Sequence, residues 1–115
     1  MAEEGLLRFR LGRGEAAQTL CVSGELDIAS APALERTVAG TMDGQDGEFC
    51  LDVSALTFMD STGARALLHV HNRVESVGRH LVILSPTRAV WRVLRITGLD
   101  QVMDVRRTPN RDRAS

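Results

Sequence analysis

One short run, residues 49–53, limits the possible folds more than any other part of the chain. It is apolar on both faces of an extended strand, which is typical of a central strand covered on two sides. Apolar residues with helical spacing precede this run over residues 31–42 and follow it over residues 62–77. The sequence therefore predicts an α/β domain in which helices pack on a sheet.

The N-terminal part has the two-residue alternation of half-buried strands. Residues 6–11 alternate apolar side chains with arginine, and residues 17–23 form a second strand after a turn at residues 12–15. We expect the two to pair as an antiparallel hairpin, with residues 24–27 ending the second strand. The apolar positions are Leu7, Phe9, Leu11, Leu20 and Val22.

Capping residues and periodicity predict three helices. The first covers residues 31–42, after Ser30 as cap. The second covers residues 62–77 and ends at Gly78, and the third follows a Ser85-Pro86 cap and closes at Gly98. The positions expected to face inward are Leu34, Val38, Met42, Ala66, Leu67, Val70, Val74, Val77, Val90, Val93 and Leu94.

Two more strands complete the predicted sheet, a buried one at residues 81–84 and an edge strand at residues 102–105. We predict a mixed four- to five-stranded sheet, with an N-terminal antiparallel hairpin and about three helices packed on it, in a single domain over residues 1–105. Residues 106–115 are rich in arginine without periodicity and are expected to form a disordered basic tail.

The charge balance excludes a general nucleic-acid binder. The 115 residues carry 14 basic and 15 acidic side chains, for a net charge of -1, whereas such binders show a strongly basic face. No apolar run is long enough to cross a membrane, and residues 1–4 are acidic where a secretory signal would be basic. We expect a cytoplasmic protein with no stable membrane association.

Cysteine and histidine spacing indicates neither a metal site nor a cofactor. Cys21 and Cys50 lie far apart in apolar runs, which favours buried reduced thiols. His69 and His71 are two residues apart on a predicted helix, so they point in different directions and are expected to be surface groups. His80 has no evident ligand partner.

The third predicted helix carries Arg88, Arg92 and Arg95 at spacings of four and three. This pattern indicates a solvated face or a contact with an acidic partner. Trp91, among them, is either a core residue or an interface anchor.

The segment Asp60-Ser61-Thr62-Gly63 opens the second predicted helix after a strand and a short loop. Aspartate, serine and threonine are preferred capping residues, so Ser61 is expected at or beside the N-cap. The loop carries Phe58 and Met59, whose apolar side chains can form a protein-binding rim. No Gly-x-Ser-x-Gly pattern is present and no histidine has an evident path to Ser61, so we do not expect an enzyme.

Residues 51–63, and Asp60-Ser61-Thr62-Gly63 above all, resemble the signature of STAS domains of the anti-sigma factor antagonist type. The resemblance covers about residues 6–105 and implies the STAS fold. One departure is Ala64-Arg65, where many members have Leu-Gly, and it bears on kinase pairing more than on the fold. Further matches are Gly24-Glu25-Leu26-Asp27 with Ala31-Pro32 after it, Ser85-Pro86, and Ile96-Thr97-Gly98-Leu99.

The resemblance implies a partner-switching protein. In this family the unphosphorylated antagonist binds an anti-sigma factor that is also a serine kinase, which frees the sigma factor. The kinase uses ATP to phosphorylate the serine after the aspartate, here Ser61, and a metal-dependent serine phosphatase reverses this. The partner-binding residues implied are Glu25, Asp27, Phe58, Met59, Asp60, Thr62, Gly63 and Arg65, with Asp60 and the Glu25/Asp27 turn beside Ser61.

Electrostatics favours a switch at the surface over one in the fold. A phosphate on Ser61 would lie where free amides and the helix dipole favour an anion. Its charge beside Asp60 would disfavour docking to a patch built for a neutral hydroxyl. The alternative is a structural STAS subunit of a signalling scaffold or a membrane-transporter complex. The intact Asp-Ser-Thr-Gly favours the switch, because some members outside sigma circuits lack a phosphorylatable residue there.

Overall fold

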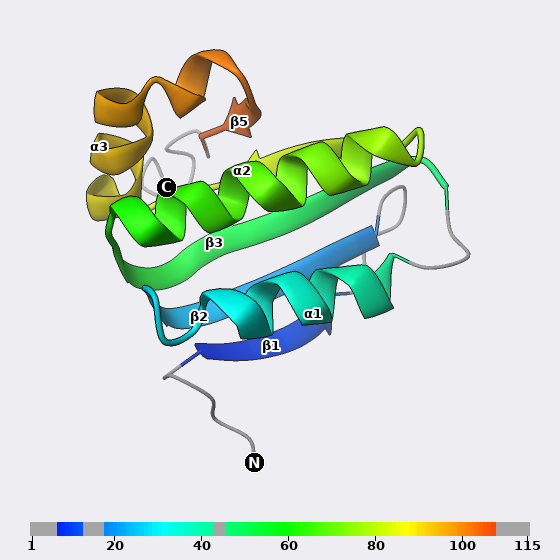
Figure 1. The fold of residues 1–115 in the computed structure, drawn as a ribbon, viewed down its shortest axis with the longest axis horizontal. Helices are drawn as coiled ribbons and strands as arrows, with labels where there is room; N and C mark the ends of the chain where they lie inside the picture. The colour runs from blue at the N-terminus through cyan, green and yellow to red at the C-terminus, as the bar shows by residue number, and fades with distance from the viewer. Residues whose placement is uncertain (1–6, 13–17, 43–45, 108–115) are drawn as a thin grey trace, which may run out of the picture.

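Strands and helices alternate along the chain in the computed structural model, which describes residues 7–12, 18–42 and 46–107 (Figure 1). The predicted hairpin, the three helices and the two further strands are all present. The elements are β1 (Leu7–Gly12), β2 (Gln18–Leu26), α1 (Ala31–Thr41), β3 (Glu48–Met59), α2 (Ser61–Ser76), β4 (His80–Leu84), α3 (Arg88–Thr97), a 3-10 helix η1 (Leu99–Gln101) and β5 (Asp104–Arg106).

The sheet has the strand order β1-β2-β3-β4-β5, so each strand pairs with the next one along the chain. β1 and β2 form the predicted antiparallel hairpin, and all other neighbours are parallel. Parallel strands end at the same edge of a sheet. The connections that follow β2, β3 and β4 therefore start from one edge, and the Asp-Ser-Thr-Gly segment is among them.

The helices cover one face of the sheet, and the core lies between them (Figure 1). Leu51 of β3 and Ile83 of β4 are fully buried there with Leu34 of α1 and Leu67 of α2. The alternation of β1 places Leu7 in this core, as predicted.

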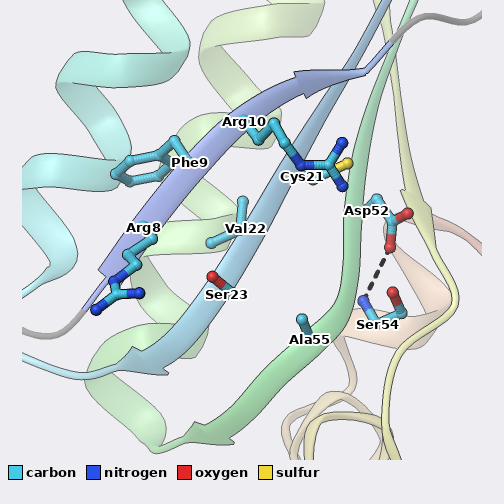
Figure 2. A pocket seen from close by; sticks show the side chains of 9 residues that line it. All are labelled: Arg8, Phe9, Arg10, Cys21, Val22, Ser23, Asp52, Ser54 and Ala55. Carbon is cyan, nitrogen blue, oxygen red and sulfur yellow. Dashed lines mark hydrogen bonds between the residues drawn. The ribbon is translucent and has the colours of Figure 1, made fainter.

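The opposite face of the sheet is covered by no helix in the described residues, which corrects the expectation that β3 is covered on two sides (Figure 1). Cys50 is still buried on this face, where its register neighbours are Thr19 of β2 and Val82 of β4. A hollow of about 340 Å³ opens here across β1, β2 and β3 (Figure 2). Its polar lining is Arg8, Arg10, Cys21, Ser23, Asp52 and Ser54.

Two strands run further than the sequence suggested. β2 continues through residues 24–26, and β3 continues from Val53 to Met59, where a loop was expected. The two extensions pair with each other across irregularities in the ladder, and Gly24 has a φ of 110° there. The Thr57 hydroxyl donates to the Gly24 carbonyl at 3.1 Å. Pairing between strands distant in sequence therefore extends both.

Two helix starts differ from the prediction. Ser30 is the N-cap of α1 by position, but its buried hydroxyl donates to the Glu25 carbonyl at 2.8 Å and caps no helix amide. Thr87, in place of Ser85, is the N-cap of α3, and its hydroxyl accepts a hydrogen bond from the Val90 amide. Gly98, with a φ of 80°, closes α3 as predicted.

A few residues at element ends are placed differently from expectation. Leu11, near the end of β1, and Val77, the C-cap that follows α2, are exposed. Cys21 is half-buried where a buried thiol was expected. Arg106, assigned to the tail, belongs to β5. The predicted disorder of residues 108–115 and the turn at residues 13–15 lie outside the described residues.

Candidate functional site

Asp60 joins β3 to α2 and caps the helix. Its backbone is extended, and its carboxylate oxygen Oδ1 accepts a hydrogen bond from the Gly63 amide at 2.9 Å. The Asp60 amide donates to the Leu26 carbonyl at 3.4 Å. Asp60 is therefore the N-cap, and Ser61 lies beside it as the first residue of α2.

Ser61 is exposed, and its hydroxyl forms no hydrogen bond to the described part of the chain. Asp60 satisfies the Gly63 amide, which leaves the amides of Ser61 and Thr62 without an acceptor among the described residues. These amides and the positive end of the α2 dipole favour an anion at this point. The site thus offers a free hydroxyl where a negative group is tolerated.

Gly63 lies in contact with the end of β2. A Cβ atom at this position would be 2.4 Å from the Leu26 carbonyl oxygen and 2.8 Å from Met59 Cγ. Real Cβ atoms do not approach backbone oxygens so closely, so glycine is needed here for packing. The contact fixes the first turn of α2, and Ser61 with it, against the ends of two strands.

The acidic residues at the end of β2 lie at the same edge of the sheet. Glu25 pairs with Phe58 in the ladder between β2 and β3. The Asp27 carboxylate accepts hydrogen bonds from the amides of Ala29 at 3.0 Å and Ser30 at 3.2 Å. Asp27 therefore shapes the turn that leads into α1.

The predicted apolar rim is wrong for one of its two residues. Met59 is 3% exposed and packs in the core, whereas Phe58 is 44% exposed. Because β3 continues to this point, neighbouring side chains lie on opposite faces and only one of the two is outside. Ile28, in the turn after β2, is 74% exposed and was not predicted. The sequence did offer a sign of this exposure, because an isoleucine that follows Asp27 within a turn has little access to the core.

An open hollow of about 290 Å³ lies beside Ser61, between α1 and α2. Arg65 borders it from the first turns of α2, and His69 Nδ1 lies 3.4 Å from Glu35 Oε2 of α1. The hollow therefore combines an apolar base with charged groups. Its lining includes Ile28, Ala31, Pro32, Glu35, Thr62, Arg65 and His69.

Comparison with known proteins agrees with this geometry. The family described as "Mlab, STAS domain" matches residues 9–106. The anti-sigma-B factor antagonist of Bacillus subtilis (strain 168) is 35% identical over 86 residues, which cover 73% of this chain and 76% of that protein. The chain belongs to the STAS-domain family of anti-sigma factor antagonists.

Solved structures share the fold of this STAS domain. An anti-sigma factor antagonist from Mycobacterium paratuberculosis has a TM-score of 0.74 and 25% identity, covering 90% of this chain and 88% of that one. The Bacillus cell fate determinant SpoIIAA in its phosphorylated form has a TM-score of 0.61 and 24% identity, covering 94% and 100%. Membership of this family agrees with the expected regulatory, non-enzymatic role.

The histidines of the STAS domain lie outside any metal-binding arrangement in the described residues. His80, for which the sequence indicated no partner, lies between two carboxylates: Nε2 is 2.8 Å from Asp104 Oδ2 and Nδ1 is 3.2 Å from Glu75 Oε2. The hydrogen bond with Asp104 raises the pKa of His80, which favours the charged form of the imidazole. His80 and the two carboxylates therefore form an ion cluster beside β5. Across the described residues, no helix is both long and apolar enough to span a membrane.

Proposed function

We propose that this STAS protein is a phosphorylation-controlled antagonist of an anti-sigma factor. Its unphosphorylated form binds an anti-sigma factor that is also a serine kinase, and the sigma factor is released. Phosphorylation of Ser61 ends this binding, and a metal-dependent serine phosphatase restores it. The observation that carries the proposal is the free, exposed hydroxyl of Ser61 directly after the capping Asp60.

The surroundings of Ser61 support a phosphate that would change the surface and leave the fold intact. The amides of Ser61 and Thr62 supply donors for the phosphate, and the Gly63 contact with Leu26 holds the helix start. A phosphate adds a charge of about -1.5 to -2. Two neighbours support the function: a relative is named an anti-sigma-B factor antagonist, and a protein of this fold has been solved in a phosphorylated form.

The partner is expected to contact the surface around Ser61. Phe58 and Ile28 offer exposed apolar side chains, and Arg65 offers a charge at the hollow between α1 and α2. A phosphate added among carboxylates would repel an acidic group of the partner and would lose hydration in the interface. The remaining residues assigned to this surface are Glu25, Asp27, Asp60 and Thr62. Gly63 and Met59, which the sequence also assigned to it, are buried and support it from the core.

Phosphorylation by candidate kinases tests the proposal. The protein is incubated with ATP and the serine kinases of its source organism, and the modified residue is mapped by mass spectrometry. Ser61→Ala should abolish labelling, whereas Thr62→Ala, the matched control, should retain it. Labelling that persists in Ser61→Ala and disappears in Thr62→Ala would move the site by one residue.

Binding to the purified kinase is then measured by titration calorimetry. Ser61→Ala should bind like the unmodified protein, and phosphorylated protein should bind much more weakly. Ser61→Asp should show a smaller loss, because it carries one charge without the phosphate geometry. If the phosphorylated and unmodified forms bind equally, the switch is wrong and a structural role in a scaffold or transporter complex replaces it.

A further inference from the structure

A second surface, the outer face of α3, carries a stripe of positive charge. Arg88, Arg92 and Arg95 follow one another at helical spacing, and all three are exposed. The half-buried Trp91 borders the stripe on one side, and Ile96, 77% exposed, borders it on the other. These residues line an open hollow of about 780 Å³. We call this surface the α3 basic face.

Within the described residues, the charge of the α3 basic face has no ion-pair partner. Arg107 adds a fourth cation, with its guanidinium carbon 4.5 Å from the centroid of the Trp91 ring. None of these four arginines forms an ion pair with another described residue. The carboxylate of Asp104, on the nearby β5, forms its ion pairs with His80 and Arg106 instead. Four positive charges therefore gather on a chain whose net charge is -1.

The arginine stripe of α3 is not explained by a contribution to the stability of the fold. Like charges at spacings of three and four destabilise a helix, and a cation in the first turn opposes the helix dipole. Arg88 is the first residue of α3, and the first turn contains no acidic residue. The Thr87 hydroxyl donates to the Leu56 carbonyl at 3.0 Å, which holds the start of the helix on β3. The basic face is therefore presented on a fixed element. The like-charge spacing and Arg88 lower helix stability, which Arg95 in the last turn offsets only in part.

We propose that the α3 basic face binds an acidic segment of a partner protein, with carboxylates along the arginine stripe and apolar side chains against Trp91 and Ile96. Arginine and tryptophan are the residue types that dominate protein interfaces energetically. A nucleic acid fits less well, because a stacked base needs an open aromatic face and Arg107 lies over the Trp91 ring. The residues that line this site do not overlap with those of the hollow beside Ser61, so we expect binding in both phosphorylation states.

Trp91 provides the measurement, because it is the single tryptophan and the chain has no tyrosine. The full chain is titrated at low ionic strength with a synthetic helical peptide that carries glutamate at every third or fourth position and leucine beside it. We expect a saturable change in Trp91 emission, weakened by added salt. Combining Arg88→Gln, Arg92→Gln and Arg95→Gln should weaken binding about tenfold or more.

The matched control combines Arg8→Gln, Arg10→Gln and Arg73→Gln, which removes the same charge from exposed positions on β1 and α2. This control and Ser61→Asp should bind the peptide like the unaltered protein, with circular dichroism confirming that every variant is folded. The proposal is overturned if the control triple loses as much affinity as the α3 triple. It is also overturned if a glutamine version of the peptide binds equally well, or if oligodeoxythymidine binds more tightly than the peptide.

Discussion

The carbonyl oxygen of Leu26 lies so close to the Cα atom of Gly63 that a Cβ atom there would be 2.4 Å from it. The same carbonyl accepts a hydrogen bond from the Asp60 amide. One backbone group at the end of β2 therefore contacts the chain on both sides of Ser61. The glycine of the Asp-Ser-Thr-Gly segment is explained by this close approach.

Replacing Gly63 by alanine should destabilise the protein by about 1–3 kcal/mol, because either the backbone of β2 or the start of α2 must move. The control is Gly40→Ala on α1, where an added Cβ meets nothing within 4 Å. That change should increase stability by about 0.5–1 kcal/mol, since alanine is a better helix former. Urea unfolding measures both, and a Gly63→Ala protein as stable as the original would refute the contact.

Asp60→Ala should lower the free energy of unfolding by about 0.5–2 kcal/mol, because it removes the acceptor for the Gly63 amide. Asp60→Asn should cost much less, since the amide oxygen of asparagine can accept the same bond. Thermal unfolding of the two variants separates capping from charge. An Asn variant as unstable as the Ala variant would show that the carboxylate charge is what matters.

Phosphorylation of Ser61 should leave the protein folded. The unsatisfied amides at the start of α2 favour the phosphate, so the melting temperature should change by no more than about 4–8 °C, the shift that about 1 kcal/mol causes in a domain of this size. Differential scanning calorimetry before and after phosphatase treatment measures the change. Global unfolding on modification would contradict a switch confined to the surface.

Arg79 ties three segments together from a buried position, with 4% of its surface exposed. Its guanidinium donates to the carbonyls of Gly47, Met42 and Glu48 and to Gln18 Oε1 at 2.9–3.1 Å. Arg79→Met should therefore cost about 3 kcal/mol or more, because buried acceptors lose their donor. Urea unfolding should show a change within about 0.5 kcal/mol for the control Arg73→Met, which alters an exposed arginine of α2. Equal losses of unfolding free energy in Arg79→Met and Arg73→Met would show that the hydrogen bonds of Arg79 do not stabilise the fold.

The His80 cluster makes stability depend on pH. The hydrogen bond with Asp104 raises the pKa of His80 above its ordinary 6.5, so protonated His80 stabilises the folded state. That contribution is complete below pH 6.5 and is lost as the pH rises through the raised value. Hydrogen bonds from Arg106 and His80 lower the pKa of Asp104 below 3.8, so its contribution is lost only as the pH falls below that value.

The melting temperatures of the original protein and of His80→Gln should therefore differ most at about pH 5 and converge above neutral pH. Asp104→Asn removes the larger cause of the raised pKa and should reduce the pH dependence of this difference, while Glu75 still contributes part of it. A difference that stays constant from about pH 5 to pH 8 would show that the pair is not coupled to folding.

The features that were predicted correctly from the sequence are those that residues close to one another in the chain determine. The alternation in β1, the apolar stripe of α2 and the glycine that ends α3 each depend on interactions within a few positions. The burial of Met59 depends on pairing between β2 and β3, which a short window of sequence does not contain. The role of Arg79 was missed because most of its acceptors are main-chain carbonyls in other segments, which leave no mark in the sequence. A cap at or beside Ser61 was predicted, because a cap is local, and the structure assigns it to Asp60.

The consecutive strand order has a kinetic consequence. Each strand of the sheet pairs with the next one along the chain, so the chain can assemble by adding one strand at a time to the edge of the growing sheet. No strand has to insert between two that are already paired. This order suits a chain that emerges from the ribosome amino end first, because each strand finds its neighbour already synthesised. β5 is then the last strand to join the sheet. Its ion pairs with His80 and Glu48 hold it at the edge, and no other strand of the described sheet has to pair with it afterwards.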